Sequence, residues 1–247
     1  MSKFRWNEIP YPGENFGPIG EGEDAGSWPL KFFERNDNDE FYDLKGNKIA
    51  FEIQTPNDTM SFGVNQLNQI KTILSNLTDK QKETALYWSS DNLILLYLNN
   101  VITLLKNYRV STMDSARILS IMGDAFNDAM VLTYYFKYKF QIPRPIQIDS
   151  KLNTYLQSSY DPSYPVGHAV IAGMASTVLS YFFPDETDQL SNTAKEAAMS
   201  KVYAGIHYPI DAEQGLRLGK QIGSIIINSI KDERNSFGNS INNIYRK

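Results

Sequence analysis

The chain has 247 residues, and its 24 lysine and arginine residues against 28 aspartate and glutamate residues give a formal net charge of −4. This balance excludes a broadly basic nucleic-acid binder, because contacts to phosphate groups need clustered Lys and Arg. The absence of cysteine excludes disulfide scaffolds and Cys-based zinc sites, and two histidines are too few for a His-rich metal site.

Residues 1–60 are predicted to form an irregular arm that packs on the core. They are rich in Pro, Gly, Asn and acidic residues and show no helical periodicity. Within them, Lys45-Gly46-Asn47 separates Phe41-Tyr42 from the apolar run that begins at Ile49, a pattern typical of a short hairpin. The amino terminus carries no apolar segment of the signal-peptide kind, so we expect a cytoplasmic or otherwise soluble protein.

Residues 61–247 are predicted to form one helical domain, so the expected fold class is all-α, a helical bundle. Apolar residues recur at helical spacing from about residue 64 to Leu77, and Thr78 is a suitable N-cap for a helix over 79–89. Residues 93–105 are apolar nearly all round, as in a helix buried within a bundle. Ser111 or Thr112 begins a long helix that runs to about Phe140, and prolines follow it. Further helices are predicted over residues 168–183, 186–203 and 209–231.

The segment Pro162–Pro184 contains no Asp, Glu, Lys or Arg, but a histidine and several hydroxyl residues interrupt it. We interpret it as a buried helix and not as a membrane span. Gly215, Gly219 and Gly223 recur at every fourth position of the last predicted helix, which favours a groove for close helix packing in the core. Helical enzymes with this much apolar surface often dimerise, so a homodimer is among the expected states.

Asp124 and Asp128 share one face of a predicted helix, one turn apart. Two carboxylates without a third ligand are more often a solvated or salt-bridged face than a metal site, so we expect them to meet Lys201 or an interface. Trp88 is assigned to the core.

Cations and both histidines fall at the ends of predicted helices. Lys137 is followed seven residues later by Arg144, which on its own is typical of a basic helix end. Gly167 precedes His168 at a predicted helix start, where a backbone N–H can approach an anion closely, although a lone histidine there is more often a cap.

The third such segment carries Lys201, His207 and Asp211. Because Asp211 follows His207 by four residues, it can accept a hydrogen bond from one imidazole nitrogen and leave the other as a nucleophile or ligand. Alone, this pair is typical of a structural His–Asp contact. Taken together, the three segments would surround an oxyanion with cations, backbone N–H groups and two imidazoles, a set suited to stabilising phosphoryl transfer.

The order of the motifs, KxxxxxxRP, then PxGH, then SxxxxGxHxxxD, resembles the vanadium-dependent haloperoxidase and type 2 acid phosphatase superfamily. The similarity is greater to the haloperoxidase branch and extends from about Trp28 to Gly223. It implies a helical bundle with an anion pocket between helices. It also implies vanadate as cofactor, with phosphate competing for the same site.

The resemblance implies a role for each matching residue. Lys137, Arg144 and Gly167 would bind the equatorial oxygens of vanadate or phosphate. His168 would be the acid–base residue, and His207 the axial vanadium ligand or the nucleophile that forms a phosphohistidine. Asp211 would hold the tautomer of His207.

Three positions depart from the family pattern. Val166 stands where the family has Ser, and Lys201 where it usually has Arg, so a hydroxyl donor and a bidentate fork are missing. The loss of one such donor costs about 1.5–3 kcal/mol of anion binding unless Ser163, Ser200 or water replaces it. Asp161 stands at the position that often lies beside the halide, and its charge would repel bromide or chloride if it points inward.

Three functions are compatible with these residues. The first is a haloperoxidase-type oxidoreductase that binds vanadate and uses hydrogen peroxide to oxidise a halide or a small organic substrate. The second is a phosphatase that acts on a phosphate ester through His207. The third is a catalytically weakened oxyanion-binding homologue. The expected partners are small molecules, with no nucleic acid and no membrane span.

Overall fold

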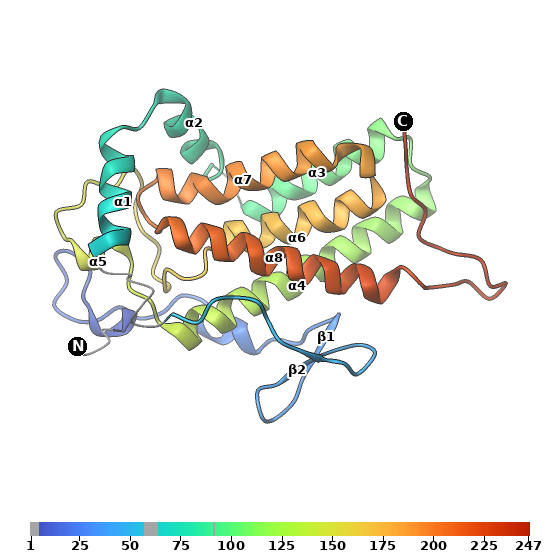
Figure 1. Cartoon of the computed structure of the whole chain (residues 1–247), viewed down its shortest axis with the longest axis horizontal. Coiled ribbons are helices and arrows are strands. Elements are labelled where there is room, and N and C mark those ends of the chain that lie inside the picture. Colours follow the sequence, from blue (N-terminus) through green and yellow to red (C-terminus); the bar gives the residue numbers. More distant parts are fainter. Residues whose placement is uncertain (1–4, 57–63, 91) are drawn as a thin grey trace.

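A computed structural model describes residues 5–56, 64–90 and 92–247 of the chain. Long helices run side by side along the molecule, and shorter helices cover one end of them (Figure 1). The helices and strands have the following bounds: η1 Trp6–Glu8, η2 Glu23–Ser27, β1 Phe33–Arg35, β2 Phe41–Asp43, β3 Lys48–Ile49, α1 Val64–Ser75, α2 Asp79–Tyr87, α3 Leu93–Asn107, α4 Thr112–Phe140, α5 Pro145–Ile148, α6 Gly167–Phe182, η3 Pro184–Glu186, α7 Thr187–Tyr203 and α8 Pro209–Ile230. The predicted all-α bundle is confirmed.

The start and end of several helices follow from capping residues. Thr78 is the N-cap of α2, as the sequence predicted, and it also forms a capping box with Gln81. Ser111 accepts a hydrogen bond from the Asp114 N–H and so caps α4. Helix α4 ends at Phe140, and its C-cap residue Gln141 has a φ of 54°. The chain therefore leaves the helix before the prolines are reached.

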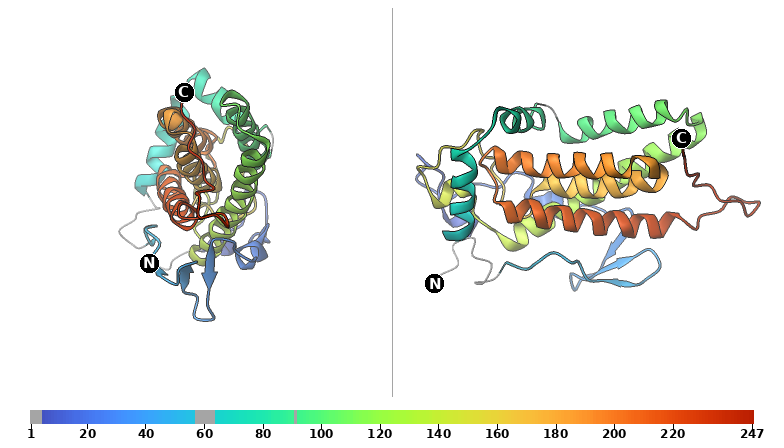
Figure 2. Two further views of the ribbon diagram at one scale, coloured as in Figure 1. Left: turned by 90° about the vertical axis from the view of Figure 1, so that its right-hand side faces the viewer. Right: turned by 45° about the horizontal axis from the view of Figure 1, so that its top comes forward.

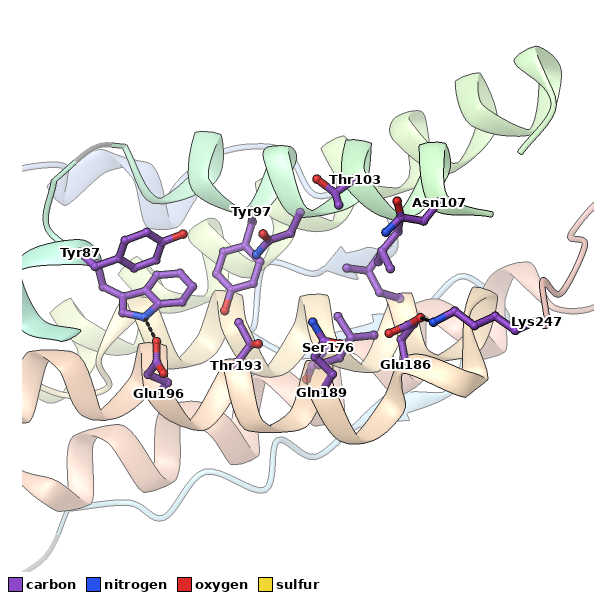
Figure 3. A pocket seen from close by; sticks show the side chains of 15 residues that line it. Tyr87, Tyr97, Thr103, Asn107, Ser176, Glu186, Gln189, Thr193, Glu196 and Lys247 are labelled. Carbon is purple, nitrogen blue, oxygen red and sulfur yellow. Dashed lines mark hydrogen bonds and ion pairs between the residues drawn. The ribbon is translucent and has the colours of Figure 1, made fainter. Parts of the chain in front are cut away.

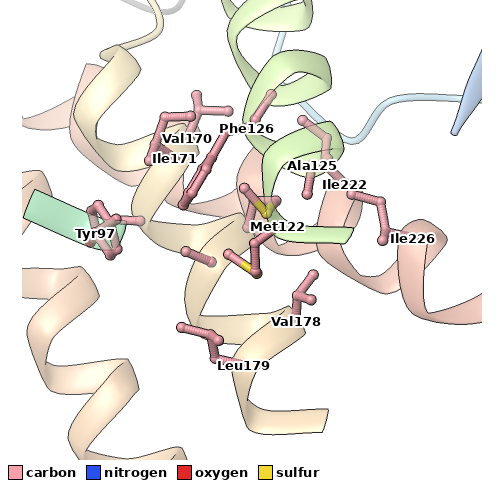
Figure 4. Close-up of a cluster of buried hydrophobic side chains, with 14 of the residues drawn as sticks. Tyr97, Met122, Ala125, Phe126, Val170, Ile171, Val178, Leu179, Ile222 and Ile226 are labelled. Atoms are coloured by element: carbon pink, nitrogen blue, oxygen red, sulfur yellow. The ribbon is translucent and has the colours of Figure 1, made fainter. Parts of the chain in front are cut away.

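Helix α6 forms the centre of the bundle, and its side chains are almost all buried. Apolar side chains from α3, α4, α6 and α8 interdigitate around it (Figure 4). Met122 of α4, Ile171 of α6 and Ile222 of α8 are each fully buried. Burial of one such side chain contributes about 1.5–3 kcal/mol, so this cluster is the main source of stability for the bundle. The predicted buried helix is therefore confirmed, and no helix of the described residues is long and apolar enough to cross a membrane.

Helices α6 and α8 approach each other closely along a row of glycines. A Cβ on Gly215 would lie 2.8 Å from the Cβ of Ala169, and one on Gly219 would lie 2.1 Å from the carbonyl oxygen of Val170. Gly223 faces Thr177 in the same way. The predicted glycine groove is confirmed, and α6 fills it.

The segment that was predicted to be irregular also contains a small antiparallel sheet in the order β1-β2-β3. The predicted hairpin is the β2–β3 pair, in which Phe41 is opposite Ile49. Strand β1 was not predicted. The sheet lies beside α4 near one side of the bundle (Figure 2), where the rings of Phe41 and Tyr135 are 5.0 Å apart.

Candidate functional site

The predicted site residues lie at the ends of four helices and in the connections between helices at the same end of the bundle. Helices α4 and α7 finish, and α6 and α8 begin, at the end of the bundle that carries α1 and α5 (Figure 1). Gly205 has a φ of 80° and turns the chain from α7 toward α8, which brings the segment around His207 to this end. The residues brought together are Lys137, Arg144, Asp161, Gly167, His168, Lys201, His207 and Asp211.

Two buried cations form one side of the site, and a carboxylate lies between them. Asp161 Oδ2 is 2.9 Å from Lys137 Nζ, and Asp161 Oδ1 accepts a hydrogen bond of 2.6 Å from Arg144 Nη2. Burial alone raises the pKa of Asp161, but the charges of Arg144 and Lys137 outweigh it and hold the pKa below its usual value. Because both of its oxygens contact buried cations, the Asp161 carboxylate points inward. We expected a carboxylate in this orientation to repel bromide or chloride.

His207 is buried, and its two ring nitrogens have different partners. Arg144 Nη1 is 2.8 Å from Nε2 of His207. Because a guanidinium only donates hydrogen bonds, Nε2 must accept and the ring proton must be on Nδ1. Nδ1 lies 3.3 Å from Oδ2 of Asp211. Burial, followed by the charge of Arg144, lowers the pKa of His207 well below its usual value, so the imidazole is neutral.

Asp211 holds the loop of His207 at the start of α8. Its Oδ2 accepts hydrogen bonds from the Tyr208 N–H at 2.9 Å and from the Ser163 hydroxyl at 2.5 Å. Its Oδ1 is buried and has no hydrogen-bond partner among the described residues. Burial raises the pKa of this carboxyl to about 6. Ser163 also lies 3.3 Å from Nδ1 of His207, but its hydroxyl proton is donated to Asp211 and so does not replace the missing donor to an anion.

His168 and Lys201 meet at one backbone carbonyl. His168 Nε2 lies 3.0 Å and Lys201 Nζ 3.2 Å from the carbonyl oxygen of Trp88. Since a carbonyl only accepts, Nε2 of His168 carries the proton. Burial, followed by the charge of Lys201, lowers the pKa of His168 to about 3, while burial lowers the pKa of Lys201 to about 8. Lys201 also donates to the Ser89 hydroxyl at 2.6 Å.

Val166 and Gly167 lie at the start of α6. The Val166 side chain packs in an apolar cluster with Ala169 and Val202, so it provides no donor to the site. No side chain of the described residues caps the start of α6, and the Ala169 N–H donates to the Val166 carbonyl at 3.1 Å. Ser200, the other expected replacement, donates to the Ala197 carbonyl and does not take part.

Sequence reasoning missed the carbonyl of Trp88. The side chain is in the core as expected, but the residue is also the C-cap of α2, where carbonyls lack helical partners. The position of Trp88 at the end of a predicted helix could have indicated a carbonyl that is available to a donor. The expectation for Asp128 was wrong, because its buried carboxylate accepts the backbone N–H groups of Lys31 and Phe32. No group of three or more acidic or histidine side chains suited to a metal ion occurs within the described ranges.

A cavity of about 410 Å³ lies between α3, α6 and α7 (Figure 3), and Trp88 is one of the residues that line it. Glu196 accepts a hydrogen bond from the Trp88 indole there, and the buried Tyr97 ring is next to it. Because its lining includes two glutamates and only one lysine, Lys247, this cavity is not suited to an oxyanion.

The comparisons with known proteins agree with this arrangement. Residues 119–234 match the PAP2 superfamily. A bacterial vanadium-dependent iodoperoxidase has a similar structure, with a TM-score of 0.70, 18% identity, and coverage of 92% of this chain and 60% of that one. The apo form of a bacterial vanadium-dependent chloroperoxidase is also similar, with a TM-score of 0.71 and 12% identity. That match covers 92% of this chain and 62% of the other.

A transmembrane PAP2-type phosphatidylglycerolphosphate phosphatase from Bacillus subtilis is also similar, with a TM-score of 0.54 and 18% identity. The match covers 69% of this chain and 87% of that one. No curated protein sequence matches the chain. The chain spans about 60% of the length of the haloperoxidase structures, and at these identities the likeness establishes the fold alone. The similar structures are thus two kinds of haloperoxidase and one phosphatase.

Proposed function

We propose that this chain is a phosphoric-ester hydrolase in which His207 forms a phosphohistidine. The observation that carries the proposal is the position of the His207 ring between Arg144 and Asp211, from which its tautomer follows. Its Nε2 lone pair is beside Arg144, and its proton is on Nδ1, on the side of Asp211. A neutral imidazole in this state is a competent nucleophile. The cation that would bind a phosphoryl oxygen therefore lies next to the nitrogen that would attack phosphorus.

The residues present do not fit vanadate as a resident group. Asp161 already neutralises one of the two charges of Lys137 and Arg144, and Val166 offers no hydroxyl. The loss of one donor weakens anion binding by about 1.5–3 kcal/mol, or roughly 10- to 150-fold. A cofactor must remain bound at low concentration, whereas a substrate binds only transiently and tolerates such a loss. The phosphatase alternative is therefore preferred to the haloperoxidase prediction for this chain.

The reaction has two steps. First, His207 Nε2 attacks phosphorus, a nitrogen–phosphorus bond forms, and the ester oxygen leaves. Water then attacks the phosphohistidine, the nitrogen–phosphorus bond breaks, and the phosphate that is released carries away the proton of the water, which leaves His207 neutral again. Because the pKa of His168 is about 3, this residue cannot protonate a leaving alkoxide at neutral pH. Aryl phosphates, whose leaving groups need no proton, should be better substrates than alkyl phosphates.

The test is hydrolysis of p-nitrophenyl phosphate by the full chain and by His207→Gln. We expect at least a 10³-fold loss of kcat in the variant, because the nucleophile is removed. Rapid quenching at alkaline pH should trap an acid-labile phosphoenzyme in the parent chain and none in the variant. Unfolding temperatures of both proteins control for misfolding.

Retained hydrolysis in His207→Gln would refute this mechanism. Bromination of an indicator that depends on added vanadate, bromide and peroxide would instead support the haloperoxidase alternative. Phosphate binding without turnover in either assay would favour a weakened oxyanion-binding homologue.

A further inference from the structure

Asp161 takes the place of an anion in the site. Each of its carboxylate oxygens contacts a different cation, at 2.6 Å from Arg144 and 2.9 Å from Lys137. The side chains of both cations are at most 3% exposed, so neither is available to a ligand from another direction. A tetrahedral oxyanion bound to these two cations would need the positions that the carboxylate oxygens now hold.

The other carboxylate of the site behaves differently. Asp211 is bound by a hydroxyl and a backbone N–H and contacts neither Lys137 nor Arg144 directly. Within the described part of the chain, Asp161 is the one carboxylate that pairs with Lys137 and Arg144 at short range. With it in place, the trio of Lys137, Arg144 and Asp161 carries a net charge of 2 − 1 = +1, where an incoming phosphate would otherwise meet +2.

We propose that Asp161 is a built-in competitor that lowers oxyanion affinity, so that phosphate or a phosphate ester binds to Lys137 and Arg144 only by displacing its carboxylate. This inference rests on the proposed role of the site in binding oxyanions, but it does not require turnover. It makes Asp161 the residue that sets the affinity of the site for its substrate.

The cations stay in place when the carboxylate leaves them, because backbone carbonyls also hold them. Arg144 donates from Nε to the Asp161 carbonyl at 2.8 Å and from Nη1 to the Ile206 carbonyl at 3.0 Å. Lys137 Nζ donates to the Pro162 carbonyl. These bonds do not involve the Asp161 side chain, so a substitution there leaves both donors directed into the site.

The first experiment measures binding of inorganic phosphate by calorimetry, in the parent chain and in Asp161→Asn. We expect at least tenfold tighter binding by the variant, because the competing charge is gone. Asp149→Asn is the matched control, since Asp149 pairs with Lys71 at the surface. Unchanged or weaker phosphate binding by a folded Asp161→Asn protein would overturn the proposal.

The second experiment uses Asp161→Ala and thermal unfolding. Removal of the carboxylate leaves two buried cations uncompensated, so the variant should unfold at a lower temperature than the parent chain. Added formate or phosphate should raise its unfolding temperature by more than that of the parent chain, since a ligand that binds the folded state stabilises it. An equal rise of the unfolding temperature in both proteins would count against the proposal. This test remains decisive if Asp161→Asn does not fold and its phosphate binding cannot be measured.

The outcomes separate this inference from the proposed function. Tighter phosphate binding by Asp161→Asn without any phosphohistidine would uphold the inference and remove the hydrolase. A trapped phosphohistidine with unchanged affinity in Asp161→Asn would uphold the hydrolase and remove the inference.

Discussion

Lys201 is a cation of the site whose charge changes with pH in an accessible range. Burial lowers its pKa to about 8, so the side chain is cationic below that pH and neutral above it. Phosphate affinity should therefore fall by about tenfold as the pH rises through 8, as expected for the loss of one charged donor. Lys201→Arg, which stays protonated, should keep its affinity to higher pH.

Calorimetry between pH 6.5 and 9.5 checks this prediction, with the exposed Lys220→Arg on α8 as the matched control. Parallel decline of affinity in the parent chain and in Lys201→Arg would show that Lys201 does not contact the anion. A shift confined to Lys201→Arg would assign the transition to that side chain.

The candidate residues could be found from sequence because their motifs combine residue types with fixed spacing. The four-residue interval from His207 to Asp211 brings both to the start of α8, and the distance of 3.3 Å between them agrees with it. The inward position of Asp161 could not be derived in this way. It depends on where a loop between α5 and α6 carries the residue relative to Lys137, and no local pattern encodes that distance.

At the level of helices, the contact between α6 and α8 leads to a prediction about Gly219. A Cβ there would lie 2.1 Å from the Val170 carbonyl oxygen, so Gly219→Ala must push the two helices apart. We expect a loss of about 3 kcal/mol or more in the free energy of unfolding, at the upper end of overpacking costs. Denaturant unfolding followed by circular dichroism measures it.

Gly123→Ala is the matched control, because a Cβ at this exposed position in α4 would have no atom within 4 Å. It should stabilise the chain by about 0.5–1 kcal/mol through better helix propensity. Equal effects of the two substitutions would contradict the packing argument.

The helices were more predictable than the strands. Caps at Thr78 and Ser111 are local signals, and the apolar periodicity of α4 persists over many turns. Strand β1 spans only Phe33–Arg35 and has too few residues to show an alternating pattern. It pairs with β2, and the chain just before it is bound by Asp128, a residue 96 positions away from Phe32. Tertiary contacts therefore determine the position of this strand, and its own sequence does not.

At the scale of the whole molecule, Asp128 joins the amino-terminal arm to the bundle. Its buried carboxylate accepts hydrogen bonds from the N–H groups of Lys31 at 2.8 Å and Phe32 at 2.7 Å. Asp128→Asn replaces an acceptor oxygen by an amide donor, which should cost about 1–3 kcal/mol. The arm should then be cleaved faster in limited proteolysis, with the cuts mapped by mass spectrometry.

Asp124→Asn is the control for this experiment, because Asp124 lies one turn earlier on α4 and makes no such bond to the described part of the arm. Faster cleavage in both variants would indicate a general effect of charge on α4. Unchanged cleavage in Asp128→Asn would show that the aromatic contacts between the sheet and α4 are sufficient to hold the arm.

The location of Asp161 outside the packed helices has an evolutionary consequence. Because the residue belongs to the connection between α5 and α6, its replacement changes no helix, and a bound anion can compensate the charges of Lys137 and Arg144 in its place. A single substitution at Asp161 could therefore convert a site whose cations are paired with its own carboxylate into a site that retains an anion, without a change of fold. Natural variation at this one position would then separate proteins that keep an oxyanion bound as a resident group from proteins that bind an oxyanion only as a substrate.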